Sequence, residues 1–598
     1  MSLPAACAQD TPRITRTAHA MLVPWGFFAR QMGLVQALER VPLPQRKRWH
    51  TPQTKLIEFL VAILGGCAYL QDISRGPHPL DQDQTVAEAW GQPAWADYSG
   101  VSRTLNACQP ETVTALRQAL AQVTQPFIDG EVVQAVQQSG KLLYDGDLTG
   151  RPVSSRSTTY EGASFGWMDD AVQLGYQAAL VSMASPTYGR LWLSVTPHPG
   201  DVVSSSQAEA LVRAAEARTG VRPRRRTELL AQRIAQSQAE VDQAQARLER
   251  RRARCQQAWK ELQAAAQQWR QWQATVAERV AWHRQRGKPA GPYSRLAKAR
   301  HKVGVCWRRL QRRNRDLTKL RHLVQRQEER VQQLQAEVAH LQERLVRFTA
   351  DNQANRSPMP ATFRLDGGFG TGENVALLIE LGYEVYGKAY GGQVTQALRR
   401  RLPARLPWTP VGDNAEMVAW SELSLDFCPY PLDIGLEHFY TGSQERYATL
   451  LHYGPETTTR DLPAWFAFYN RRQSIEAGVK EGKQVFQMHH LKVRSAAGLA
   501  IQEEFAVLAA NLVRWASHWL QQQCPQAQAP FNQPRAAVKQ LVRVAANTTA
   551  WVFWQSEGDL LLMFDELSPF PGLELRIGYA GAFQLPLPWF KSDYFEPF

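Results

Sequence analysis

Apolar residues in two stretches of the chain recur at alternating spacings of four and three, the period of a coiled-coil seam. The two seams are Leu230, Ile234, Ser237, Val241, Ala244 and Leu248, then Leu317, Leu320, Val324, Gln327, Val331, Leu334, Val338, Leu341 and Leu345. One strong breaker, Gly287 to Pro292, lies between arms of 60 residues (227–286) and 58 residues (293–350). Matched arms around one turn predict an antiparallel helical hairpin.

The positive charge of the chain is concentrated in this hairpin. Residues 222–349 contain 31 Lys and Arg against 11 Asp and Glu, a net charge of +20, whereas the rest of the chain carries −6. The excess peaks at the tip, where residues 251–320 hold 19 basic and 3 acidic side chains. Such a field predicts a polyanionic partner, most often nucleic acid, with a merely solvated basic helix as the alternative. Aromatic residues at helical spacing usually line a seam, so packing is the expected role of Trp259, Trp269, Trp272, Trp282 and Trp307.

Outside the hairpin, short apolar strands alternate with helical patterns. Strands are expected at 141–147, 172–183, 190–196, 361–366 and 383–389, with helices at 204–220 and 372–381 and a long helical stretch from Pro463. The resulting order, three strands followed by helix, strand, helix and strand, predicts an α/β RNase H-like core with a mixed sheet.

The two ends of the chain have different sequence patterns. Residues 1 to about 135 read as short helices, and the segments 85–90 and 99–107 have helix-turn-helix spacing. Residues 550–598 read as a small β appendage. We therefore expect a helical N-terminal DNA-binding domain (1–137), the first part of the core (138–221), the basic antiparallel coiled-coil insertion (222–358), the second part of the core (359–515) and a C-terminal helical and β segment (516–598).

Composition excludes several classes of protein. A hydrophobic content of 44% excludes wholesale disorder, and 598 residues predict two to four domains. The longest apolar run, 59–70, is shorter than the roughly 20 residues of a membrane span, so no membrane partner is expected. The seven cysteines never form a CxxC pair, which argues against a disulfide scaffold or a zinc ribbon and favours the reducing cytoplasm.

Three acidic residues form a candidate site. Asp147 and Asp366 end predicted strands, and Glu476 lies on a predicted helix from Trp465 to Gln484. On that helix Tyr469, Arg472, Glu476 and Lys483 share a stripe about 60° wide, whereas Glu481 falls outside it. Three converging carboxylates bind hard divalent cations, and two such ions about 3.5–4 Å apart promote phosphoryl transfer.

Each of these residues also has an ordinary interpretation. Asp366 is followed by two glycines and would fit a plain turn, and Glu476 with Lys480 would fit a helix-surface ion pair. Asp145 would face the same side of the strand as Asp147 and is the alternative first acid. The combination of three acids with a basic hairpin favours a catalytic site.

The segment from Tyr469 to Lys483 fits the pattern Y-x2-R-x3-E-x6-K without a gap. It resembles the signature of bacterial insertion-sequence DDE transposases that carry a Tyr-Arg-Glu-Lys (YREK) motif. Asp147-Leu148-Thr149 looks like their D-x-T block, and Arg364 to Phe369 looks like their R-x-D-x-G-F block. The resemblance covers residues 138–221 and 359–515.

This resemblance implies an enzyme that cleaves DNA and transfers strands. Asp147, Asp366 and Glu476 would hold two Mg²⁺ or Mn²⁺ ions, and a homodimer would bring transposon ends and target DNA together. Phosphates near the cleaved terminus would be contacted by Tyr469, Arg472 and Lys483. Relatives carry a β-rich insertion before the glutamate helix, whereas the large insertion here is the helical hairpin.

Two other functions stay open at this stage. A nuclease of the same fold that does not transpose would have the same metal site. A non-catalytic DNA-binding coiled-coil protein with a decayed core is disfavoured, because all three acids are present. Terminal inverted repeats beside the gene would distinguish a transposase from the nuclease.

Overall fold

The computed structural model describes residues 13–47, 49–156, 159–402, 407–490, 492–524, 538–555 and 559–578. These residues form two compact units. One is built within 1–224 and 355–598, and the other is 225–354, which lies inside the predicted insertion.

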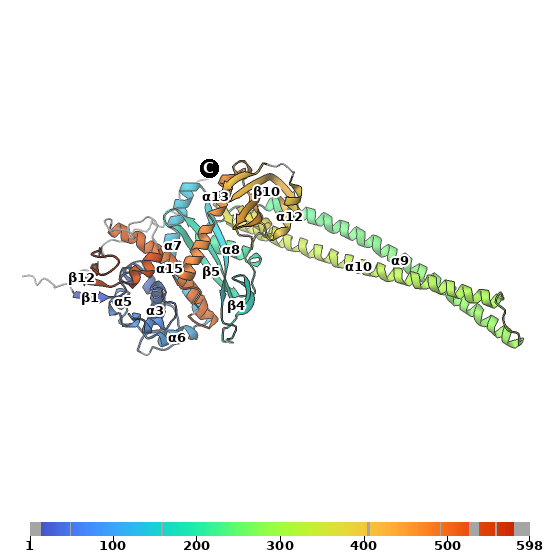
Figure 1. Cartoon of the computed structure of the whole chain (residues 1–598), viewed down its shortest axis with the longest axis horizontal. Coiled ribbons are helices and arrows are strands. Elements are labelled where there is room, and N and C mark those ends of the chain that lie inside the picture. Colours follow the sequence, from blue (N-terminus) through green and yellow to red (C-terminus); the bar gives the residue numbers. More distant parts are fainter. Residues whose placement is uncertain are drawn as a thin grey trace, which may run out of the picture. The chain divides into compact units, whose positions relative to one another are not determined.

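A ten-stranded mixed sheet organises the first unit (Figure 1). Strands β2, β6 and β7 are parallel neighbours, and the other neighbours pair antiparallel. The mixed α/β sheet predicted from the sequence is confirmed. Along the sheet the order is β3 (Ser164–Met168), β4 (Ala171–Ser185), β2 (Leu142–Pro152), β6 (Ala361–Arg364), β7 (Glu384–Lys388), β11 (Gln444–Tyr453), β10 (Cys428–Thr441), β9 (Ala415–Leu425) and β8 (Thr409–Gly412), and β5 (Gly189–Pro199) pairs with β4.

Side-chain alternation along β2 assigns different chemistry to the two faces of the sheet. The Tyr144 hydroxyl lies 2.8 Å from the Thr219 hydroxyl of α8 (Ala208–Thr219), which also packs on β4 and β5. Asp145 and Asp147 point to the other face, where α14 (Gln473–Gln484) packs on β2. The polar residues of this strand therefore lie beneath the helix that carries Glu476.

Four strands of the sheet lie in a segment to which the sequence analysis assigned no element. Strands β8 to β11 form antiparallel hairpins between α12 (Gly392–Arg401) and α13 (Leu462–Asn470). Charged residues and prolines such as Pro429 and Pro431 interrupt their apolar positions, so no run reads as a strand by itself. Pairing of β11 with β7 attaches this group of strands to the parallel strands.

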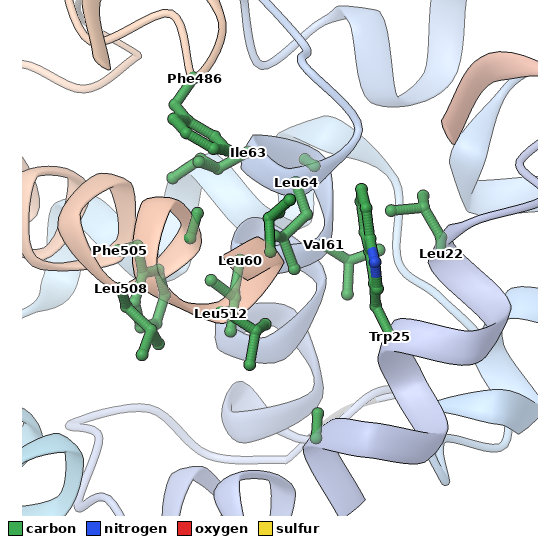
Figure 2. Packing of buried hydrophobic residues seen from close by; sticks show 14 of the residues in the cluster. Leu22, Trp25, Leu60, Val61, Ile63, Leu64, Phe486, Phe505, Leu508 and Leu512 are labelled. Carbon is green, nitrogen blue, oxygen red and sulfur yellow. The ribbon is translucent and has the colours of Figure 1, made fainter. Parts of the chain in front are cut away.

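The N-terminal helices share one hydrophobic core with the C-terminal part of the chain. Figure 2 shows Leu60 and Leu64 of α3 meeting Phe505 and Leu512 of α15, with Trp25 of α1 beside them. The helices of this region are α1 (Leu22–Gln31), α2 (Leu34–Glu39), α3 (Pro52–Leu64), α4 (Asp72–Arg75), α5 (Gln84–Ala89), α6 (Tyr98–Ala107), α7 (Pro110–Ser139), α15 (Ala496–Gln523) and α16 (Val538–Arg543).

A second, four-stranded sheet joins the two ends of the chain. Its order is β1 (Arg13–Thr17), β12 (Ala550–Trp554), β13 (Leu560–Phe564) and β14 (Glu574–Ile577), all antiparallel. The β character expected near the C-terminus is present, although its partner β1 was not foreseen. Residues 579–598 of that predicted appendage lie outside the described residues.

Helix α15 is the central helix of this core. Within the described residues it alone is long and apolar enough to cross a membrane, and 78% of its most apolar window is buried. This burial is the property of a core helix.

The second unit is the predicted antiparallel hairpin (Figure 1). Helices α9 (Thr227–Gln285) and α10 (Arg295–Ala354) run side by side, and their seam contains Val241, Ala244, Leu248, Val331, Leu334 and Val338. Arg252 pairs with Glu328 at 2.6 Å, and Arg313 pairs with Glu261 at 2.6 Å. These contacts between α9 and α10 confirm that the base of one arm meets the base of the other.

Near the tip, Trp269 packs on Trp307 with ring centroids 5.0 Å apart. This contact confirms a packing role for these two tryptophans. Trp259, Trp282 and Trp307 nevertheless stay between 41% and 44% exposed, so aromatic surface accompanies the basic side chains.

Leu60→Ala should lower the free energy of unfolding by about 2–5 kcal/mol, because it removes a fully buried side chain from the shared core. The control Leu567→Ala, at a residue 97% exposed, should change it by less than about 0.5 kcal/mol. Urea denaturation of the full chain measures both values. Hydrogen exchange of the Leu60→Ala variant should show that the backbone amides of α3 and β12 lose protection together. If the amides of β12 alone kept their protection, this result would contradict a single core.

Candidate active site

Parallel pairing of β2 and β6 brings the two candidate aspartates to neighbouring positions. Asp145 is the register partner of Arg364, the last residue of β6, so Asp147 on β2 and Asp366 just after β6 each lie two residues beyond this pair. Asp147 was predicted at a strand end, and this is wrong, because β2 continues to Pro152 through its antiparallel pairing with β4. Only β6 ends beside the site.

The backbone after β6 fixes the Asp366 carboxylate. Its Oδ1 accepts hydrogen bonds from the amides of Gly368 (2.9 Å) and Phe369 (3.3 Å), which leaves Oδ2 available to other groups. The preceding residue, Leu365, donates its amide to Tyr386 (2.9 Å) and accepts a bond from the Tyr469 hydroxyl (3.1 Å). Asp366 therefore sits in a turn held from both sides.

The glutamate helix is not the continuous helix from Trp465 to Gln484 that the sequence predicted. It is divided into α13, ending at Asn470, and α14, beginning at Gln473. Tight turns join them, since the amide of Arg472 bonds the Tyr469 carbonyl three residues earlier (2.9 Å). The four signature residues therefore do not form one straight stripe.

Two glycines let α14 lie close to its neighbours. A Cβ on Gly478 would come within 2.9 Å of the Trp192 ring, and a Cβ on Gly482 would come within 2.7 Å of the Met488 sulfur. Because this face is buried, the opposite face of α14 is free to present Glu476, whose side chain is 60% exposed.

All three carboxylates converge on the guanidinium of Arg472. Nη2 lies 3.7 Å from Asp147 and 3.4 Å from Asp366, and Nη1 donates to Glu476 at 2.9 Å. Since the two aspartate oxygens contact one nitrogen, they are at most about 7 Å apart, a span that suits two ions about 3.5–4 Å apart. The structure thus brings together the three acids that the sequence selected.

Burial changes the electrostatics of the cluster. It is the main cause that raises the pKa of Asp147 to about 7; the charges of Asp366 and Glu476 contribute to this rise, and Arg472 opposes it. Burial by itself would lower the pKa of Arg472, but Tyr469 and the three acids outweigh it, so that pKa lies above its ordinary value. Arg472 is 5% exposed and its Nε has no hydrogen-bond partner among the described residues.

Arg472 was expected to point toward the acids and to serve DNA phosphates. Its direction is as expected, but in this structure it forms buried ion pairs with the acids themselves. Tyr469 is buried and its hydroxyl bonds the Leu365 carbonyl, and burial raises its pKa. Lys483 lies 3.9 Å from Asp169, which is its ion-pair partner in this structure.

Asp145 has a different environment from Asp147. Its two oxygens accept bonds from Arg364 at 2.7 and 2.8 Å, and Arg190 lies 3.3 Å away. Only 1% of Asp145 is exposed. Saturated by two arginines, it ties β2, β5 and β6 together, which leaves Asp147 as the first candidate acid. The sequence did not indicate a role for Arg190, because a single arginine near the start of a strand is common.

The donor chemistry of the cluster fits a hard divalent cation, because all three acids offer carboxylate oxygens. Within the described residues, however, no three His, Cys, Asp or Glu side chains lie close enough to hold an ion directly. The physical reason is the guanidinium between them, which fills the cationic position. Asp147, Asp366 and Glu476 would hold an ion once Arg472 turns away.

Comparison of the chain with the profiles of known protein families and with curated protein sequences finds no match.

Arg472→Gln should strengthen Mn²⁺ binding in the absence of DNA by about tenfold or more, because a cation about 4 Å away opposes the ion by on the order of 1–4 kcal/mol. The titration is made calorimetrically at pH 8, above the pKa of Asp147, so that this carboxylate is charged. The control Arg471→Gln changes an exposed neighbour and should leave the affinity unchanged. Unchanged or weaker binding by Arg472→Gln would show that the guanidinium does not compete with ions.

Proposed function

We propose that this protein is a DDE transposase, which cleaves DNA and transfers strands of an insertion sequence with divalent metal ions. The observation that carries the proposal is the convergence of Asp147, Asp366 and Glu476 from two parallel strands and one helix. This geometry adds to the Tyr-Arg-Glu-Lys signature, which is a property of the sequence alone.

The strand order supports an RNase H-like core. In the order β5-β4-β2-β6-β7 the first two pairings are antiparallel and the last two are parallel. Helix α8 follows β5, and α11 (Gly372–Glu380) connects β6 with β7, as the sequence-based prediction requires. Strands β8 to β11 precede the glutamate helix, the position at which the relatives named above carry a β-rich insertion.

In the proposed reaction, Asp147, Asp366 and Glu476 would hold the metal ions through their carboxylate oxygens. Such ions would supply activation of a water or a 3′-hydroxyl and stabilisation of the leaving oxygen. Tyr469 holds the backbone before Asp366 in position through its bond to Leu365. Arg472 exchanges its carboxylate partners for a DNA phosphate, because a guanidinium pairs equally well with either anion.

The proposal includes the partners that the resemblance implies. A homodimer would pair two transposon ends with target DNA, and the reaction would take place in the bacterial cytoplasm.

Asp366→Asn should abolish cleavage, by about a thousandfold or more, while leaving DNA binding intact. The amide keeps the shape of the turn but loses the negative charge that an ion requires. The substrate is linear DNA carrying the gene with its native flanks, incubated with Mg²⁺ or Mn²⁺. The matched control Asp426→Asn alters an exposed aspartate in the β9–β10 turn and should retain activity.

The products of this assay distinguish the alternatives. Excision with joining to new DNA supports a transposase, whereas cleavage without joining supports a nuclease of the same fold. Full cleavage by Asp366→Asn would refute the metal-site assignment.

The hairpin supplies the charge expected of a nucleic-acid contact. Its tip region, 251–320, has 19 basic against 3 acidic residues, so ion pairs such as Arg313–Glu261 compensate only a small part of the charge. Dense like charges repel unless an anion neutralises them. We assign the hairpin to DNA, with exchange of an arm between subunits as the competing use.

Replacing residues 250–325 by a short loop should weaken binding to long DNA and paired-end assembly. Metal-dependent chemistry on a pre-nicked end should survive, because the acids lie in the other unit. Gel-shift and light-scattering measurements follow binding and assembly. If both are unchanged, the hairpin is neither a DNA contact nor a dimer element.

A further inference from the structure

A cleft in the first unit lies beside the acid cluster and has a volume of about 880 Å³. Its walls come from the ends of β4 and β5, from α13 and α14 and from α15. Four arginines line it: Arg190, Arg364, Arg471 and Arg514. Two of them, Arg190 and Arg364, are the partners of Asp145.

The positive charge in this cleft exceeds the negative charge. Arg190 and Arg364, with side chains 8% and 3% exposed, share the single carboxylate of Asp145. Arg514 pairs with Glu481 at 2.9 Å. Arg471 is exposed and has no ion-pair partner among the described residues. Four guanidinium groups therefore face two carboxylates.

An uncompensated charge in a buried setting is costly, and a bound anion removes that cost. Burial together with Arg364 and Arg514 lowers the pKa of Arg190 to about 10, against the opposing effect of Asp145. Burial is the main cause of this lowered pKa, and the two neighbouring arginines add to it. Phosphate, like carboxylate, has oxygens that fit the planar guanidinium fork.

Three elements connect the cleft to the acid cluster. On β2, Asp145 pairs with two arginines that line the cleft, and Asp147 belongs to the cluster. After β6, Arg364 lines the cleft and Asp366 joins the cluster. At the junction of α13 and α14, Arg471 lines the cleft and Arg472 holds the acids.

The spacing between the two sites suits successive phosphates of one strand. Residues two apart on a strand lie about 6.6 Å from each other, the rise of about two nucleotides in a B-form strand. We propose that the cleft binds a backbone phosphate of the DNA strand held at the acid cluster, one or two nucleotides from the reacting phosphate. This inference rests on the proposed function and identifies where the strand continues.

Arg471→Ala tests the cleft without touching its buried ion pairs. The probe is a fluorescein-labelled nicked duplex, and binding is measured without divalent metal so that cleavage plays no part. The variant should bind about five- to tenfold more weakly, and the slope of log Kd against log salt should fall by about one. Arg471→Lys keeps the charge and should restore the slope, and Arg460→Ala, an exposed arginine that does not line the cleft, should match the wild type.

A neutral methylphosphonate placed at single positions of the probe locates the contact. One or two nucleotides from the nick, it should weaken binding by the wild type and have no effect on Arg471→Ala. An unchanged affinity and slope in Arg471→Ala would overturn the proposal. Binding of tripolyphosphate that depends on Arg471 while DNA binding does not would also overturn it, in favour of a free nucleotide.

The two proposals fail in different ways. Arg471-dependent binding without any Asp366-dependent cleavage would support the cleft and refute the enzyme. Cleavage that is lost in Asp366→Asn but insensitive to Arg471 would refute only the cleft.

Discussion

One buried guanidinium, that of Arg472, allows three carboxylates to lie together at the centre of the sheet. Without a cation, Asp147, Asp366 and Glu476 would repel one another across a partly buried space. Arg472 contacts all three within 4 Å, so the carboxylates are brought together without a metal ion. Under the proposed function the same charge would have to move aside for metal ions, so the ion pairs would both organise the site and keep ions out.

A second ion-pair centre lies next to the first along β2. Asp145 draws Arg190 and Arg364 together from β5 and β6, and this pairing fixes the relative positions of the strands that carry Asp147 and Asp366. The two centres use alternate residues of the same segments. The first contains more carboxylates than guanidinium groups, and the second contains more guanidinium groups than carboxylates. An acid-rich cluster beside an arginine-rich cleft is the arrangement that a polyanion strand with bound cations would need.

The rest of the first unit keeps this arrangement rigid. Helix α15 is buried along most of its length and packs against both the N-terminal helices and β5, so the two chain ends are parts of one core. The hairpin unit is organised differently. A narrow apolar seam holds its arms together, and basic residues far outnumber acidic ones on the rest of the unit. The chain thus separates a packed chemical core from an extended electrostatic element.

The sequence alone determined the features that depend on local periodicity and composition. The hairpin, its antiparallel pairing, the mixed sheet and the three acids were all readable, because seam spacing, apolar strand-forming runs and the pattern from Tyr469 to Lys483 are properties of consecutive residues. Tertiary structure decided what depends on pairing between distant segments. It extended β2 beyond Asp147, divided the glutamate helix at Arg472, joined β1 to β12 and formed β8 to β11. It also gave Asp145 and Asp147 different roles, because two like residues on one strand face differ only in the charges that other strands and helices bring to them.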